Sequence, residues 1–160
     1  MLKTCAVFVV AIPLTIPNLA FAADAPAGNE IESVTKEFVQ AFVEGDAEKM
    51  QPHFAPDVIV ERDPERGVRK NDQLRDDYAK MISAIGRDRW SELFKKVKPT
   101  VVKAAAAGEV FEFVKAGDYI CDLHWRESRK GQRNGLDEAV IFVFRLVDGK
   151  YKLIGHYADY

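Results

Sequence analysis

The sequence predicts an α+β domain in which helices come first and a curved antiparallel sheet follows. Between Glu30 and Gly86, apolar residues recur mainly at spacings of three and four, as on one face of an amphipathic helix. From Thr100 onward the pattern changes to short alternating segments separated by turn residues, which is typical of strands. Helices followed by a strand-rich half indicate a segregated α+β domain with the sheet curled around the helices.

The first 22 residues have the layout of a secretory signal peptide. Lys3 precedes an apolar run from Cys5 to Pro13, and small residues end the segment at Ala22. The run is too short and too interrupted by proline for a membrane span. We therefore expect cleavage after Ala22 and an exported protein, periplasmic or secreted, without a membrane anchor.

The rest of the chain is long enough for one domain with a sizeable core. We expect residues 23–29 to be a flexible lead and residues 30–160 to form a single domain. The 160 residues carry 23 Lys and Arg against 25 Asp and Glu, and this mild balance is not a footprint for nucleic acid. Cys121 is the only cysteine after residue 22, so an intrachain disulfide is not expected there.

The helical half contains three clear segments and a fourth candidate. The first segment runs from Glu30 to Gly45, the second is capped by Asp46 and reaches Met50, and the third begins at Asn71 or Asp72 and ends at Gly86. Residues 87–98 also show helical spacing, either as a lid over the domain or as a further helix packed on the core.

Several strands are expected. Residues 54–57 are predicted to form a turn before a short strand at Val58 and Val60, and residues 63–67 to reverse the chain. Five strands are predicted in the second half, of which the first two could be one bent strand: Thr100–Ala106, Val110–Lys115, Tyr119–Ser128, Glu138–Val147 and Tyr151–Tyr157.

The stretch from Phe38 to Gly67 resembles the opening helices and first strand of the NTF2-like superfamily. That superfamily has a cystatin-like cone and includes SnoaL-like cyclases, ketosteroid isomerases and non-catalytic members. The resemblance implies three to four N-terminal helices packed in a curved antiparallel sheet, with a pocket between them. Isomerase chemistry is improbable, because Phe38 and Arg62 stand where those enzymes carry an acid and a base.

Two function classes remain open. In the first, the protein binds a small apolar ligand or self-associates, with a pocket lined by aromatic residues: Phe38, Phe42, Tyr78, Trp90, Tyr119, Trp125 and Phe142. In the second, it is a SnoaL-like lyase, isomerase or hydrolase that uses a pocket carboxylate with a Tyr or His. The candidate catalytic residues are Asp57, Asp63, Glu127, Tyr78 and Tyr119.

Strand alternation assigns faces to the remaining polar residues. Tyr119, Cys121, Leu123 and Trp125 are predicted on the inner face, which leaves Asp122, His124 and Arg126 outside and Glu127 at the mouth. Tyr151, Leu153 and Tyr157 share a face, which predicts His156 on the opposite one. No spacing typical of a metal or nucleotide site is present, so no cofactor is expected.

A homodimer is expected from the resemblance and from the last two strands. Both strands are apolar on both faces, as a covered sheet requires, and Ile141 and Val143 would otherwise lie on the outside.

Overall fold

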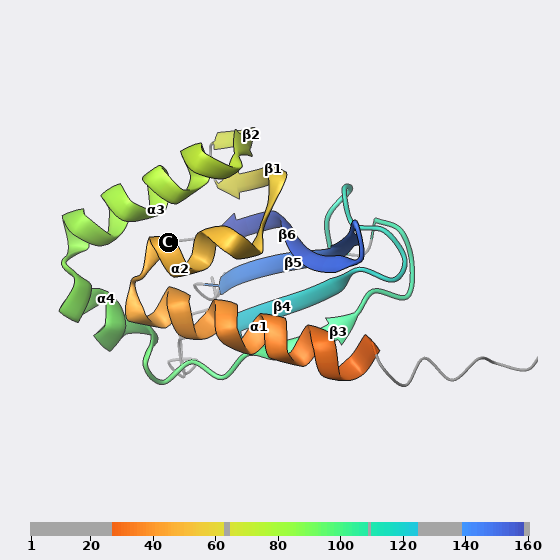
Figure 1. Ribbon diagram of the computed structural model, residues 1–160, viewed down its shortest axis with the longest axis horizontal. Coiled ribbons are helices and arrows are strands. Elements are labelled where there is room, and N and C mark those ends of the chain that lie inside the picture. The colour runs from red at the N-terminus through yellow and green to blue at the C-terminus, as the bar shows by residue number, and fades with distance from the viewer. Residues whose placement is uncertain (1–26, 63–64, 109, 125–138, 159–160) are drawn as a thin grey trace, which may run out of the picture.

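The structure is a computed structural model that describes residues 27–62, 65–108, 110–124 and 139–158. Its helices lie along one side of a curved six-stranded sheet (Figure 1). The α+β architecture predicted from the sequence is therefore confirmed. None of the helices in the described residues has the length and apolar character needed to cross a membrane.

The helices follow the predicted order. They are α1 (Ala27–Glu44), α2 (Ala47–Met50), the short 3-10 helix η1 (Gln51–His53), α3 (Asn71–Ile85) and α4 (Arg87–Phe94). Gly45 links α1 to α2 with a φ of +65°, which favours glycine. The Asp46 carboxylate caps α2 by accepting from the Lys49 backbone N–H at 3.1 Å.

The strands are β1 (Phe54–Arg62), β2 (Glu65–Lys70), β3 (Thr100–Lys103), β4 (Tyr119–His124), β5 (Ala139–Val147) and β6 (Lys150–Ala158). Their order across the sheet is β2-β1-β6-β5-β4-β3. All neighbouring pairs are antiparallel except β1 and β6, which run parallel.

Four predicted segments differ from the structure. Residues 54–57 belong to β1 and not to a turn, and residues 65–70 form β2, which pairs with β1 as a hairpin. Residues 110–115 form no strand; they belong to the segment between β3 and β4. The predicted strand at 100–106 is shorter and ends at Lys103.

The core is an aromatic cluster between α1 and β5. The ring of Phe38 meets the rings of Phe142 and Phe144 edge-on, with centroids 4.8 and 5.5 Å apart. Phe42 packs against Trp90 of α4, whose indole N–H donates to the Phe42 carbonyl. These side chains are fully buried and fix α1 and α4 against the concave face of the sheet.

The segment between β3 and β4 (residues 104–118, the covering loop) lies over the outer, convex face. Phe111 stacks on Phe113 with centroids 5.5 Å apart and packs against Tyr157 of β6 at 5.3 Å. Arg145 of β5 holds the loop by donating to the Asp118 carboxylate at 2.6 and 2.8 Å and to the Phe113 carbonyl at 2.9 Å. The chain therefore covers part of its own convex face.

A β-bulge in β6 changes which residues face the helices. Val143 of β5 pairs with Gly155, but the next residue, Phe144, pairs with Leu153, so Ile154 is an extra residue. The extra residue shifts the alternation by one. His156 thus faces the helices together with Leu153, whereas Tyr157 faces outward.

Candidate functional site

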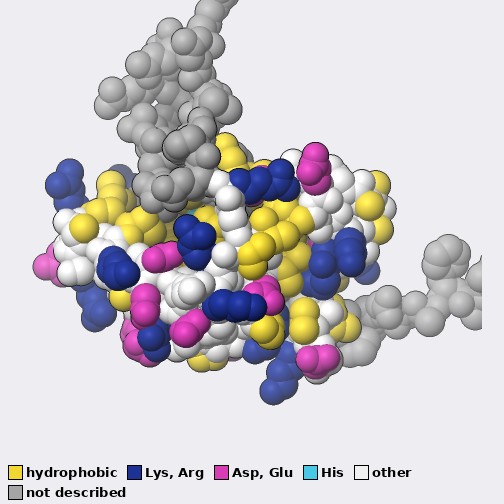
Figure 2. All heavy atoms as spheres, turned by 90° about the horizontal axis from the view of Figure 1, so that it is seen from above, with side chains coloured by type: hydrophobic (Ala, Val, Ile, Leu, Met, Phe, Trp, Pro, Cys, Tyr) yellow, Lys and Arg dark blue, Asp and Glu magenta, His cyan; other side chains and the backbone are white. Residues whose placement is uncertain are grey.

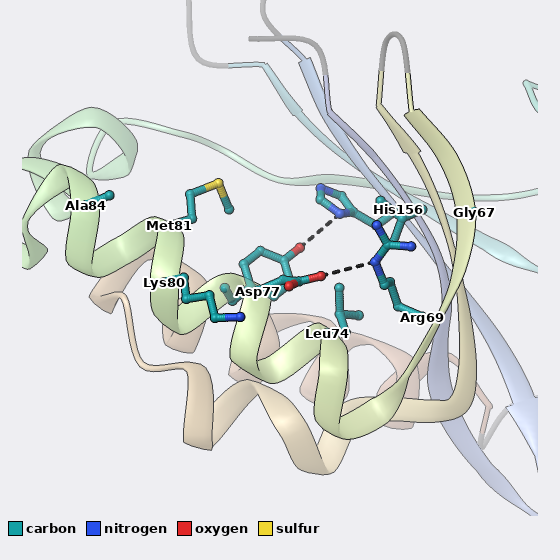
Figure 3. A pocket seen from close by; sticks show the side chains of 10 residues that line it. Gly67, Arg69, Leu74, Asp77, Lys80, Met81, Ala84 and His156 are labelled. Atoms are coloured by element: carbon teal, nitrogen blue, oxygen red, sulfur yellow. Dashed lines mark hydrogen bonds and ion pairs between the residues drawn. The ribbon is translucent and has the colours of Figure 1, made fainter.

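A pocket of about 480 Å³ lies between α3 and the sheet, next to strands β1, β2 and β6 (Figure 3). Its walls combine apolar side chains with a few polar ones. The lining residues are Val60, Gly67, Arg69, Leu74, Asp77, Tyr78, Lys80, Met81, Ala84 and His156. This size and mixed lining are typical of small-molecule sites.

The interior of the pocket carries a hydrogen-bonded pair, Tyr78 of α3 and His156 of β6. The Tyr78 hydroxyl oxygen lies 3.2 Å from His156 Nδ1, and both residues are buried. The imidazole also stacks on Phe142 with centroids 5.3 Å apart, so its orientation is fixed by the core. Such a pair can bind a polar group of a ligand or move a proton.

The mouth of the pocket is charged. Arg69 projects from β2 and donates through Nε to the Asp77 carboxylate of α3 at 3.2 Å. Figure 3 shows this ion pair beside the Tyr78–His156 hydrogen bond, with Lys80 one turn further along α3. Both partners of the ion pair are a third to a half exposed, and such pairs are weak because water screens them.

Of the aromatic residues predicted to line the pocket, Tyr78 does so. Phe38, Phe42, Trp90 and Phe142 are instead fully buried in the core. Tyr119 lies on β4, away from the pocket, with its ring edge-on to Tyr151 at 5.4 Å. Trp125 lies outside the described residues.

Asp57, the predicted catalytic carboxylate that falls among the described residues, does not line the pocket. Asp57 is half exposed on β1 and pairs with Lys70 at 2.6 Å. Asp63, Glu127 and the outer-face candidate Arg126 lie outside the described residues. His124 ends β4, where it pairs with Ala139, and Asp122 is half-buried on the same strand. Asp77 is thus the carboxylate that the described part of the pocket contains.

His53 packs against the aromatic core and does not line the pocket. Its ring meets Phe38 edge-on at 6.0 Å, and burial lowers the pKa of its imidazole. Among the described residues, no group of three His, Cys, Asp or Glu side chains is arranged to hold a metal ion.

Sequence reasoning missed four polar residues of this site for two reasons. His156 was predicted on the opposite face because simple alternation does not include the bulge at Ile154. Arg69, Asp77 and Lys80 carried no motif, and residues 65–70 were not recognised as a strand. Gly67 and Arg69 alternate on β2 with Arg66 and Val68, a pattern that becomes visible only once the hairpin with β1 is known.

Comparisons with solved structures show the same architecture at low sequence identity. The chain is similar to an NTF-2-like protein of unknown function from Shewanella oneidensis MR-1, with 10% identity, a TM-score of 0.53, and 82% of this chain and 98% of that chain covered. It is similar to an NTF2-like protein of unknown function from Pseudomonas putida KT2440, with 11% identity, a TM-score of 0.53, and coverage of 84% and 87%.

A DUF4783 family protein from Bacteroides ovatus ATCC 8483 is also similar, with 10% identity, a TM-score of 0.50, and coverage of 77% and 91%. No family model and no curated protein matches the sequence. Similarity at identities this low shows a shared fold and does not show a shared activity. The helices on the concave side of the curved sheet, together with these neighbours, show that the chain has the NTF2-like fold.

Proposed function

We propose that this protein is a binding domain for a small, largely apolar ligand, and that the ligand occupies the pocket between α3 and the sheet. The observation that carries the proposal is the pocket itself, about 480 Å³ with the Tyr78–His156 pair inside it. Apolar walls provide the binding free energy through burial, and a few convergent polar groups provide orientation.

The apolar part of the lining is built by two elements that face each other. Leu74, Met81 and Ala84 lie along one side of α3, and Val60 lies opposite them on β1. Ala84 is exposed at the far end of this row, so a larger side chain there would enter the pocket without disturbing the core.

Native mass spectrometry of the protein purified from its source tests the proposal, because it reports any retained small molecule directly. We expect a bound species that Ala84→Trp removes. Ala79→Trp is the matched control, since Ala79 is exposed on α3 but lines a different depression, beside Gly45 and Gly86. No retained molecule, and no binding of apolar probes by the folded protein, would contradict the proposal.

An enzyme remains the second candidate, and the same Tyr78–His156 hydrogen bond favours it. A Tyr and a His in contact within a pocket can transfer a proton to a bound substrate. Among the described lining residues, the carboxylate available to such an enzyme is that of Asp77, which accepts a hydrogen bond from Arg69 at the mouth. Recovery of the retained molecule chemically altered by the wild type and unaltered by Tyr78→Phe would identify the enzyme.

We also propose that the protein is exported, on the basis of the signal-peptide layout of residues 1–22, which lie outside the described residues. Amino-terminal sequencing of the protein from the periplasm or medium is expected to begin at Ala23. A chain retained in the cytoplasm with its first 22 residues intact would contradict export.

A further inference from the structure

Among the described residues that line the pocket, the mouth has more cationic than anionic side chains. Arg69 and Lys80 stand against one carboxylate, that of Asp77. Lys80 is exposed and forms no ion pair with any described residue. On the surface shown in Figure 2, Lys and Arg side chains are interspersed with Asp and Glu side chains. Arg69 and Lys80 are set apart by their place in the lining of a cavity with apolar walls.

The Arg69 guanidinium has N–H donors beyond the one that it uses for Asp77. Its Nε donates to Asp77, and the two terminal nitrogens of the guanidinium have no acceptor among the described residues. A guanidinium presents five N–H groups in a planar fork, and two parallel N–H groups match the two oxygens of a carboxylate or sulfonate. Because the Arg69–Asp77 pair is partly exposed, a ligand anion can share or replace it at small cost.

Gly67 provides the space in which this guanidinium lies. A Cβ at position 67 would lie 3.1 Å from Arg69 Nη1, closer than an ordinary contact. The φ of Gly67 lies outside the left-handed range, so its backbone conformation does not require glycine. A larger residue at position 67 would therefore crowd the Arg69 guanidinium, but it would not strain the backbone.

The polar groups of the pocket are thus separated along its length. The charged residues Arg69 and Lys80 lie at the mouth, Leu74 and Met81 line the walls, and the Tyr78–His156 pair lies inside (Figure 3). A ligand that satisfies all three regions has an anionic group, an apolar body and an inner polar atom.

We propose that the ligand of this pocket is a small amphipathic organic anion whose carboxylate or sulfonate is bound by Arg69, with Lys80 adding long-range attraction. This inference rests on the proposed binding function and specifies the chemistry of its ligand. Asp77 holds Arg69 in position while the pocket is empty and competes with the ligand anion for it.

Two fluorescent probes that share one ring system separate this proposal from simple apolar binding. Anilinonaphthalene sulfonate carries the anion, and N-phenylnaphthylamine is the same skeleton without it. In the wild-type protein we expect the sulfonate to bind about tenfold more tightly, since a hydrogen bond to a charged group contributes at least that much. Fluorescence titration gives both dissociation constants, and Ala84→Trp identifies the signal that comes from this pocket.

Arg69→Gln is expected to lower the ratio of the two dissociation constants from about ten to about one, because the sulfonate loses its guanidinium partner. Arg66→Gln is the matched control, because Arg66 lies on the same strand but on the outer face, where it pairs with Glu61 at 3.0 Å. Gly67→Ala is expected to weaken sulfonate binding by crowding the guanidinium. Circular dichroism confirms that each variant is folded before titration.

The outcomes distinguish the two proposals. Equal binding of both probes, or a preference that survives Arg69→Gln, would overturn anion recognition and leave the apolar binding function standing. Failure of both probes to bind the wild-type pocket would overturn both proposals. A preference that is lost in Arg69→Gln and kept in Arg66→Gln supports the anionic ligand.

Discussion

Two ion pairs of the same length show that the contribution of a charged residue to the stability of the fold depends on its burial. Asp118–Arg145 and Asp57–Lys70 both measure 2.6 Å, but the Asp118 side chain is 4% exposed and that of Asp57 is 53% exposed. The Asp118 carboxylate also accepts from the Lys115 backbone N–H at 2.7 Å and raises the pKa of Arg145. Asp118 therefore fixes the covering loop to β5, whereas the Asp57 pair is screened by water.

We expect Asp118→Asn to lower the free energy of unfolding by about 2 kcal/mol, because it leaves a partly buried guanidinium without its carboxylate. Urea unfolding, followed by tryptophan fluorescence, measures the change. Asp57→Asn, the matched control, is expected to change it by less than about 0.5 kcal/mol. Equal effects of the two substitutions would show that Asp118 does not hold the loop.

Cys121 is a buried residue whose environment predicts its reactivity. Burial raises the pKa of its thiol to about 12 from a usual value of 9.0, and the charge of Asp122 adds to the shift. In the folded protein the thiol therefore stays protonated at pH 8, where the thiolate is the reactive form. The thiol ionises at a lower pH in the unfolded chain than in the folded protein. The free energy of unfolding is therefore expected to fall as the pH rises from about 9 toward 12.

We expect the folded chain beginning at Ala23 to show almost no reaction with a disulfide reagent such as Ellman's reagent at pH 8. The same chain in urea is expected to release one equivalent, since Cys121 is then exposed. Rapid labelling of the native protein would mean that β4 opens readily.

Among the secondary-structure elements, helices were easier to predict from the sequence than strands. The boundaries of α2 followed from Asp46, whose carboxylate makes the expected cap. The start of β1 was missed because Pro56 suggested a turn. Pro56 is tolerated because pairing with β2 starts at Asp57 and the register with β6 shifts between Phe54 and Ile59, so neither ladder needs its missing N–H.

Residues 110–115 were predicted as a strand because apolar residues recur closely there. In the structure Phe111 and Phe113 contact the convex face of the sheet rather than adding a strand to it. Apolar residues that cover a sheet and apolar residues within one can give similar short patterns, and only the tertiary contacts distinguish them.

The β6–loop contact is tight at Gly155. A Cβ added there would lie 2.2 Å from an edge carbon of the Phe113 ring, although the φ of Gly155 needs no glycine. We expect Gly155→Ala to lower the free energy of unfolding by about 2 kcal/mol through overpacking. Gly28→Ala, in α1, is expected not to lower it, because the added Cβ would meet no atom within 4 Å beyond the neighbouring backbone and alanine favours a helix. Equal urea midpoints for the two variants would show that Phe113 moves aside freely.

For the molecule as a whole, the covering loop buries part of the convex face through which a homodimer was expected. Val143 was expected to need a partner, but it is fully buried by the chain itself. Of the large apolar side chains still exposed, Val68 and Val102 lie on the two edge strands, and Val110 lies on the loop. The homodimer stays a prediction, and a contact through this face would involve the outside of the loop.

Sedimentation velocity at micromolar concentration checks this prediction. We expect a dimer that Val110→Glu dissociates, because a charge would be buried at the contact. Leu93→Glu is the matched control, since Leu93 is equally exposed but lies on α4, away from the convex face. A clean monomer of the wild-type protein would contradict the homodimer.

The candidate site was predictable only in part, because its members come from distant parts of the chain. Tyr78 was identified from the apolar stripe of α3 and lines the pocket. Its partner His156 depends on the bulge, and Arg69 depends on a hairpin strand whose first residues, Glu65, Arg66 and Gly67, show little preference for a sheet. Long-range register, rather than local propensity, assembled this pocket.

The bulge has a consequence for how the protein tolerates deletion. Removing Ile154 would join Leu153 directly to Gly155, and plain alternation would then keep Leu153 and His156 inward and leave Gly155 facing Phe113. A homologue one codon shorter in this strand can thus retain the same pocket. In a sequence alignment, we expect a homologue that lacks the bulge to show a one-residue gap opposite Ile154.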